Sequence, residues 1–384
     1  MGVSRWSFEQ GPIRPPSEAA SLLLRFTRNC PWNKCTFCPV YKGATFSRRS
    51  LQEIKRDIDT VVEIIEDVKK FSWSLGEGGK ITSYVIQELT NRSGLSYSYY
   101  NVVQWLFFNT GQVFIQDANS LIMSSDELAE AIRYLRERVP GVRRVTSYGR
   151  SSTIARKSLE ELIMLKEAGL DRIHIGMESG SDRVLKYVRK GATARQHIEA
   201  GQKVKAAGIT LSEYIMPGLG GKAWSEEHAI ETARVLTEID PDFIRLRTLQ
   251  VPPFGELWED VRAGRFIPLS DDESVKEIRL LIESLGNVHS TLTSDHIRNL
   301  LEEVSGKLPD DRESMLAVID EYLALPPEDK ILFRIGRRGG ALRSVRELQD
   351  PLTRLRLERA RRTLESELGK DIEFVINELA AQHI

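Results

Sequence analysis

The chain has 384 residues, which is enough for two domains or for one large α/β barrel with an appended region. Its 54 lysines and arginines against 55 aspartates and glutamates give a formal net charge of −1, so no overall field would draw it to nucleic acid or to an anionic membrane. The sequence contains no apolar run long enough to span a bilayer, and its start lacks the apolar core of a signal peptide, so we expect a cytoplasmic protein without a membrane span.

The first elements surround a loop that contains cysteines. Residues 1–18 contain three prolines and few apolar side chains, so we expect an extended arm. An apolar run over residues 21–27 predicts a strand, and apolar residues at three-to-four spacing over residues 50–70 predict a helix. Between them lies "RNCPWNKCTFCPVYKG", residues 28–43, which holds every cysteine of the chain, at Cys30, Cys35 and Cys38.

Strands and helices then alternate along the chain. Five further strand candidates lie at residues 112–123, 142–150, 171–182, 210–221 and 242–251. Each of the first four is followed by a helical pattern, and such alternation is typical of parallel βαβ units. Six units predict an α/β fold, a partial (β/α)6 barrel of the TIM type. Functional residues are then expected where strands end and loops begin.

Two regions interrupt this alternation. Residues 70–111 form a long, aromatic-rich insertion, which is either a lid over a planar or apolar substrate or a small satellite core. After residue 266 we expect helices at 271–286, 294–305, 311–324 and 344–379. The predicted domains are therefore an arm at 1–18, a barrel at 19–265 and a helical region at 266–384. Within the last region, "GRRGG" at residues 336–340 predicts a flexible charged turn more readily than an anion site.

The cysteine spacing Cys-x4-Cys-x2-Cys brings three thiols together in one loop after the first strand. From the loop alone, three interpretations remain open. The thiolates hold a four-iron cluster with one open iron, or a zinc ion with a remote fourth ligand such as His174, or no metal at all.

The wider sequence resembles a known superfamily. Phe37 immediately precedes the last cysteine, and "IHIGMESGSDRVLKYVRKG" (173–191) and "YIMPGLGG" (214–221) follow at the fourth and fifth strands. Together these segments resemble the radical S-adenosylmethionine (SAM) enzymes over roughly residues 20–255. The subgroup most similar includes the oxygen-independent coproporphyrinogen oxidases, the tRNA methylthiotransferases and the elongator-type catalytic subunit. The common family spacing is Cys-x3-Cys-x2-Cys, so this chain has one additional residue in the first gap.

The resemblance implies an iron–sulfur enzyme. Cys30, Cys35 and Cys38 would bind a [4Fe-4S] cluster whose open iron is chelated by SAM. Reductive cleavage of SAM would then give a 5′-deoxyadenosyl radical that abstracts hydrogen from a substrate. An electron donor such as flavodoxin or ferredoxin is implied as a partner.

The resemblance also implies residues that contact SAM. At the second and third strand ends, Asp117 would accept the methionine ammonium, with Gln116 and Asn119 nearby, and Arg150 would bind the carboxylate. The plain alternatives are that Asp117 and Asn119 cap a turn and that Arg150 forms a surface ion pair.

At the fourth and fifth strand ends, Glu178 and Ser179 would bind the ribose or the methionine end. Ile215 and Met216 would flank adenine, and Phe37 would form a wall beside it. The plain alternative for Glu178 and Ser179 is an ordinary strand-to-helix turn.

The sequence restricts the substrate without naming it. No cysteine remains for a second cluster, which disfavours methylthiotransferase chemistry, and no separate basic module is visible, so nucleic acid is an unlikely partner. We expect a small-molecule substrate. The alternatives are a chaperone of the same fold that carries haem or another cofactor, and an RNA-modifying radical enzyme.

Overall fold

The structure is a computed structural model and describes residues 6–367 and 371–381. Residues 1–5 of the predicted arm and 368–370 of the predicted last helix lie outside the described residues. The chain forms two compact units, and each is described by itself. The first comprises residues 1–33, 40–175 and 202–211, and the second comprises residues 34–39, 176–201 and 212–384.

Parallel strands form the sheet of the first unit. They are β1 (Leu22–Arg25), β4 (Gln112–Gln116), β5 (Arg144–Gly149) and the first residues of β6 (Arg172–Glu178). β1 pairs with β4, β4 with β5 and β5 with β6, all in parallel. Leu22, Val113 and Val145 have no exposed surface, as expected for strands that are buried in an α/β protein.

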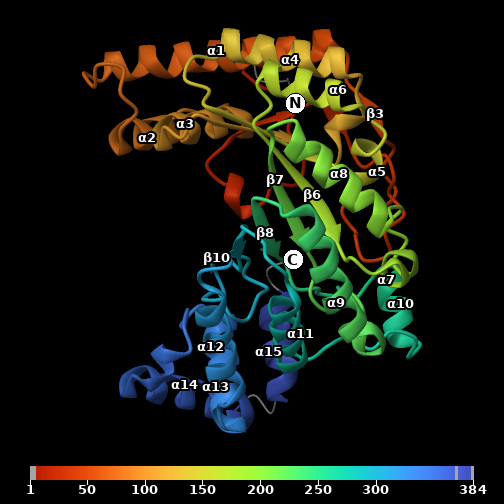
Figure 1. The fold of residues 1–384 in the computed structure, drawn as a ribbon. Coiled ribbons are helices and arrows are strands. Elements are labelled where there is room, and N and C mark those ends of the chain that lie inside the picture. The colour runs from red at the N-terminus through yellow and green to blue at the C-terminus, as the bar shows by residue number, and fades with distance from the viewer. Residues whose placement is uncertain (1–5, 368–370, 382–384) are drawn as a thin grey trace. The chain divides into compact units, whose positions relative to one another are not determined.

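Three amphipathic helices of this unit pack in a row. They are α1 (Leu51–Ser74), α4 (Ser125–Arg138) and α6 (Leu159–Ala168). α1 packs against α4 and α4 against α6, and Figure 1 shows the three next to one another. Each begins at a serine cap, Ser50, Ser124 or Ser158, whose hydroxyl accepts a backbone N–H of the first turn. The shorter elements of the unit are η1 (Pro16–Glu18), β2 (Thr27–Arg28), β3 (Ser47–Arg48), η2 (Ser120–Ile122) and α5 (Ser151–Ile154).

The predicted aromatic insertion forms the end of α1 together with α2 (Ser83–Thr90) and α3 (Tyr97–Phe108). Asn101 on α3 reaches the outer edge of β1, where its amide accepts the Leu23 N–H at 2.9 Å and donates to the Ser21 carbonyl at 3.1 Å. Because β1 is the first strand of the sheet, this side chain satisfies backbone groups that would otherwise face water. The insertion therefore covers a sheet edge.

The second unit continues the strand and helix alternation. Its strands are the end of β6, most of β7 (Thr210–Ile215), β8 (Phe243–Leu246), β9 (Thr291–Thr293) and β10 (Gly306–Lys307). β7 pairs with β8 and β8 with β9 in parallel, whereas β9 and β10 are antiparallel. Its first helices are α7 (Asp182–Tyr187), the larger part of α8 (Ala194–Ala206), α9 (Gly221–Ile239) and α10 (Glu256–Arg262).

The predicted α/β fold with a partial barrel is confirmed. All six predicted strands are present as β1, β4, β5, β6, β7 and β8, in one mostly parallel eight-stranded sheet of order β1-β4-β5-β6-β7-β8-β9-β10. The prediction that strands end before residue 266 is wrong, because β9 adds to β8. The expected helix at 294–305 is wrong too, since this segment is a loop between β9 and β10. The predicted domain boundaries stay a prediction.

Helices make up the rest of the second unit. They are α11 (Asp271–Ser284), α12 (Arg312–Leu323), α13 (Pro327–Arg338), η3 (Arg346–Gln349), α14 (Pro351–Arg362), η4 (Thr363–Glu367) and α15 (Ile372–Ala381). α11 packs against α9, and the two lie beside each other in Figure 1. The predicted flexible turn at 336–340 is wrong in part, because Arg337 and Arg338 end α13 and are buried. Among the described residues, no helix combines the length and apolar character needed to cross a bilayer.

One buried acidic side chain of the core has no hydrogen-bond partner among the described residues. Glu213 on β7 has no exposed surface, and neither carboxylate oxygen has a hydrogen-bond partner among the described residues. Burial raises the pKa of Glu213 well above its usual value, against the attraction of Lys190 and with the repulsion of Glu178. Glu213 is therefore protonated in the folded protein at pH values where it ionises in the unfolded chain.

This difference makes stability depend on pH. The contribution of neutral Glu213 to stability is fully present below the pKa of this residue in the unfolded chain, about 4.3. As the pH rises from there toward the pKa in the folded protein, the free energy of unfolding falls by about 1.4 kcal/mol per pH unit. We expect Glu213→Gln to remove this loss, so that the variant gains stability over the wild type between pH 5 and pH 8. Urea unfolding at both pH values measures the effect. The exposed control Glu167→Gln should show no such gain, and a pH-independent difference for Glu213→Gln would contradict the assignment.

Candidate functional site

The cysteine loop starts and ends at a short strand pair in the first unit. Thr27 and Arg28 of β2 pair with Arg48 and Ser47 of β3, so the chain leaves and returns at one place directly after β1. The Arg28 guanidinium donates to Glu9 at 2.7 Å and to Glu53 at 3.0 Å. These ion pairs connect the base of the loop to the N-terminal arm and to α1.

Asp117, at the carboxyl end of β4, is the centre of the hydrogen bonds around this loop. Its side chain has no exposed surface, and its Oδ2 accepts from the Arg25 Nε at 2.6 Å and from the Asn29 backbone N–H at 2.7 Å. Its Oδ1 accepts from the Tyr41 hydroxyl at 3.0 Å. Asn29 immediately precedes Cys30 and Tyr41 follows Cys38, so Asp117 holds the loop on both flanks. Burial, together with the Asp117 charge, raises the pKa of Tyr41 and keeps its hydroxyl a donor.

Asparagines shape the loop itself. Asn29 and Asn33 adopt left-handed conformations, with φ of 67° and 48°, which asparagine tolerates better than most residues. The Asn33 amide also donates to the Ala44 carbonyl at 3.3 Å and its backbone N–H donates to the Cys30 Sγ at 3.4 Å. An N–H directed at sulfur stabilises a thiolate there.

The remaining predicted residues of the first unit support the same segment. Gln116 is buried and exchanges hydrogen bonds of 2.9 Å in both directions with the backbone of Gly11, so it holds the N-terminal arm. Asn119 is also buried; its Oδ1 accepts the Arg150 N–H at 3.1 Å and its amide donates to the Thr153 hydroxyl at 2.9 Å. Both amides are thus occupied by protein partners.

Arg150, at the exit of β5, is half-buried. Its guanidinium carbon lies 5.1 Å from the centre of the Trp32 ring, a cation–π distance. Trp32 lies inside the first cysteine gap, which is one residue longer than the common spacing. Trp32 therefore supplies an aromatic platform for Arg150.

In the second unit, Phe37 and Met216 belong to one apolar cluster, with Val184, Val188 and Leu219. The Thr36 N–H donates to the Val188 carbonyl at 3.0 Å and so fixes the loop segment beside α7. The sequence predicted that Phe37 and Met216 both face adenine, and the structure brings the two together.

Glu178 lies at the end of β6 in a left-handed conformation, with φ of 66°. Its Oε1 lies 2.9 Å from the Lys190 Nζ, and that ammonium lies 5.9 Å from the centre of the Phe37 ring. Glu178, Lys190 and Phe37 therefore form a connected group. Strained backbone at strand ends is common at functional sites. Lys190 was not predicted, although it lies within the quoted segment 173–191.

His228 on α9 joins two strand ends in the second unit. Its Nε2 lies 3.1 Å from the Met216 carbonyl oxygen, which can only accept, so Nε2 is the donor there, and its Nδ1 lies 2.8 Å from the Ser179 hydroxyl oxygen. Glu277 accepts the Gly218 N–H at 2.6 Å and supports the turn that follows Met216. Neither side chain was predicted, because nothing in the spacing of α9 and α11 indicates which polar residue faces inward.

Backbone groups after β7 are engaged by protein. The Met216 N–H donates to the Glu178 carbonyl at 3.0 Å, and the Ile215 carbonyl accepts from the Arg247 N–H at 2.9 Å. Ile215 is fully packed, whereas part of the Met216 side chain is accessible.

Comparison with known proteins identifies the family. Residues 24–233, more than half of the chain, match the Radical SAM superfamily. The chain belongs to this superfamily. Its members use a [4Fe-4S] cluster and SAM, which confirms the predicted cofactors at the level of the family.

Individual relatives are distant and match only in part. The tRNA uridine(34) acetyltransferase of Methanocaldococcus infernus is 26% identical over 123 residues, which are 32% of this chain and 23% of that protein. The tRNA-2-methylthio-N(6)-dimethylallyladenosine synthase of Prosthecochloris aestuarii is 22% identical over 178 residues, 45% of this chain and 36% of that protein. The match thus spans less than a quarter of the first relative and just over a third of the second.

Among solved structures, coproporphyrinogen III oxidase (HemN) from Escherichia coli is similar with a TM-score of 0.42 and 12% identity. The match covers 65% of this chain and 48% of that one.

The donor set of this chain fits a cluster with an open iron. Cys30, Cys35 and Cys38 are half-buried and the chain has no other cysteine, so a cube bound here keeps one corner for another ligand. In a cube each thiolate binds a different iron, so the ligands do not converge on one ion. Within residues 6–367 and 371–381, no three His, Cys, Asp or Glu side chains are gathered around a single metal position. His174, the suggested zinc ligand, is buried and lies 3.3 Å from Glu18.

The contacts of Asp117 predict its effect on stability. Asp117→Asn removes the charge that Arg25, Asn29 and Tyr41 share, and loss of one partner from a buried ion pair costs about 3 kcal/mol or more. We expect a fall of that size in the free energy of unfolding, measured with urea. Asp59→Asn is the matched control, because Asp59 also accepts from an arginine and a tyrosine but is 39% exposed, and should change stability by less than about 1 kcal/mol. Equal effects of the two variants would contradict the role of Asp117.

Proposed function

We propose that this protein is a radical SAM enzyme in which Cys30, Cys35 and Cys38 hold the [4Fe-4S] cluster. When bound and reduced, the cluster supplies the electron that cleaves SAM to methionine and a 5′-deoxyadenosyl radical, and the radical abstracts hydrogen from a substrate. A donor such as flavodoxin or ferredoxin supplies that electron. The observation that carries the proposal is the loop of three thiols, directly after the first strand of a chain that matches the superfamily.

The residues around the loop have separate tasks in this proposal. Asp117 positions the cysteine loop, since its oxygens are occupied by Arg25, Asn29 and Tyr41. We propose that Arg150, oriented by Asn119 and Trp32, binds the methionine carboxylate. Gln116 positions the N-terminal arm.

We further propose that Phe37 and Met216 contact adenine and that Glu178 accepts hydrogen bonds from the ribose. Lys190 orients the Glu178 carboxylate. Ser179 positions the turn after β7 through His228, because its hydroxyl is already hydrogen-bonded to that imidazole. Ile215 packs behind Met216.

We favour a small molecule as substrate. The names of the two curated relatives above contain tRNA, so excluding nucleic acid as a partner has no support from them, and an RNA-modifying radical enzyme is the second candidate function. Two measurements distinguish the small-molecule hypothesis from the RNA hypothesis. They are whether RNA copurifies with the protein, and whether tRNA or a small-molecule extract stimulates formation of 5′-deoxyadenosine. The haem-chaperone hypothesis stays a prediction.

Alanine at Cys30, Cys35 or Cys38 tests the cluster. After anaerobic reconstitution and reduction, we expect the wild type to contain about four irons per chain and to convert SAM to 5′-deoxyadenosine and methionine. Each variant should lose the cluster and this reaction, because a missing thiolate leaves two irons without protein ligands. Iron and sulfide assays with chromatography of the nucleoside products measure both. Val40→Ala, at an exposed position of the same loop, is the control that should keep both properties. Iron content unchanged in all three cysteine variants would refute the proposal.

Arg150→Lys tests the carboxylate contact. Lysine keeps the charge but loses the planar fork, and a charge-assisted hydrogen bond contributes about 1.5–3 kcal/mol. We expect SAM affinity to fall by about tenfold or more, measured by equilibrium dialysis with reconstituted protein, while iron content stays unchanged. Arg133→Lys, on the exposed side of α4, should leave affinity unaltered. The same affinity in Arg150→Lys and wild type would exclude this contact.

A further inference from the structure

The loop at residues 294–305 is fixed against the exit of β8 in the second unit. The Asn299 amide donates to the Leu246 carbonyl at 2.8 Å, and its oxygen accepts the Thr248 N–H at 2.9 Å. Asn299 therefore holds both neighbours of Arg247. Because Arg298 precedes Asn299, this clamp brings Arg298 and Arg247 together.

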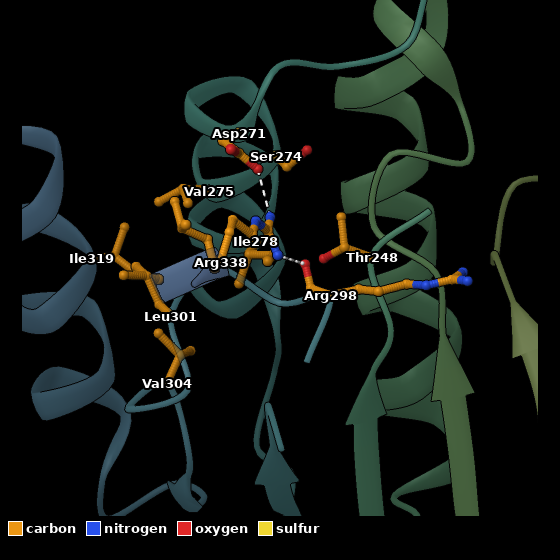
Figure 2. Close-up of a pocket in the computed structure, with 11 residues that line it drawn as sticks. Thr248, Asp271, Ser274, Val275, Ile278, Arg298, Leu301, Val304, Ile319 and Arg338 are labelled. Carbon is orange, nitrogen blue, oxygen red and sulfur yellow. Dashed lines mark hydrogen bonds and ion pairs between the residues drawn. The ribbon is translucent and has the colours of Figure 1, made fainter. Parts of the chain in front are cut away.

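Two buried arginines hold the other side of this loop. Arg338 on α13 donates to the Arg298 carbonyl at 2.8 Å and to the Asp271 carboxylate at 2.7 Å. Arg337 donates to the Leu300 carbonyl at 3.2 Å. Figure 2 shows the Arg338 guanidinium between Asp271 and Arg298, at a pocket whose other side chains are mainly apolar. The guanidinium groups of Arg337 and Arg338 are thus engaged by carbonyl and carboxylate groups of the protein.

Arg298 itself points elsewhere. In Figure 2 its side chain extends past Thr248, away from Arg338 and the pocket. Asp295, the nearest acidic residue in sequence, lies 3.5 Å from Arg245. Arg298 is half-buried, and neither it nor Arg247 forms an ion pair among the described residues. The Arg298 Nε also lacks a hydrogen-bond partner there.

A half-buried cation next to a second, exposed cation is costly when neither has an acidic partner among the described residues. Burial, with a further contribution from Arg247, lowers the pKa of Arg298 to about 10. Arg298 still carries its charge at pH 7. An oxyanion between the two guanidinium groups would relieve the repulsion and satisfy the Nε–H of Arg298.

The pair lies next to a segment that the proposed function uses. The Arg247 N–H donates to the Ile215 carbonyl at 2.9 Å, one residue before Met216. We propose that Arg247 and Arg298 bind an oxyanion group of the substrate, a carboxylate or a phosphate; this inference rests on the proposed function for its placement beside SAM. The site takes one anionic group and not an RNA backbone, because the neighbouring Arg245, Arg337 and Arg338 are buried and occupied.

The test is the dependence of the melting temperature on inorganic phosphate and on succinate, for the reconstituted protein at constant ionic strength with potassium chloride as the balance. We expect one or both anions to raise the melting temperature of the wild type saturably. Arg298→Met and Arg247→Met should weaken that apparent affinity at least tenfold. Phosphate alone, succinate alone or both identifies the group. Arg262→Met, on exposed α10, is the control and should bind as the wild type.

Three results would overturn the inference. They are a shift no larger than that of chloride, an equal shift in Arg298→Met and Arg247→Met, and a loss of SAM affinity in Arg298→Met, which would assign the pair to SAM. Formation of 5′-deoxyadenosine is measured in parallel on each protein. If the wild type forms 5′-deoxyadenosine but its melting temperature does not respond to the anions, only the arginine site is contradicted. If the wild type has no iron or forms no 5′-deoxyadenosine, the proposed function is contradicted and the melting-temperature result for the anions still stands.

Discussion

The buried carboxylate of Asp117 accepts hydrogen bonds from both flanks of the cysteine loop, and the rest of the site depends on this interaction. A buried carboxylate is stable only when its oxygens are matched by donors. Arg25 supplies the opposite charge, and the Asn29 backbone N–H and the Tyr41 hydroxyl donate hydrogen bonds that fix the orientation of the carboxylate. A long loop with three thiols is thereby fixed at its two flanks by a single side chain of a neighbouring strand.

The same arrangement recurs at other strand ends. Asn119 orients the exit of β5, His228 joins the exits of β6 and β7, and Asn299 clamps the exit of β8. In each case a polar side chain satisfies backbone or hydroxyl groups that the end of a strand leaves unpaired. The carboxyl ends of the strands are therefore held rigidly, which a site that orients a reactive cofactor requires.

Six strands and the helices between them were predictable because short, largely apolar runs alternate along the chain with patterns of helical spacing. The cysteine site was also predictable, because all three cysteines lie within one short segment. The partners of Asp117 were not predictable, because Asn29 and Tyr41 lie 88 and 76 residues away from it along the chain. β9 was missed since a three-residue strand carries too little pattern. Arg337 and Arg338 were assigned to a turn, although their backbones end a helix and their side chains bind carbonyl groups and Asp271.

We propose that three thiolates of this protein hold a cluster whose open iron binds SAM. Electron paramagnetic resonance of the anaerobically reconstituted, reduced protein tests it most directly, with spectra recorded before and after addition of SAM. We expect the signal of a reduced [4Fe-4S] cluster that changes in shape and position when SAM is added. A cluster signal that SAM leaves unchanged, or a reconstituted protein without any such signal, would contradict it.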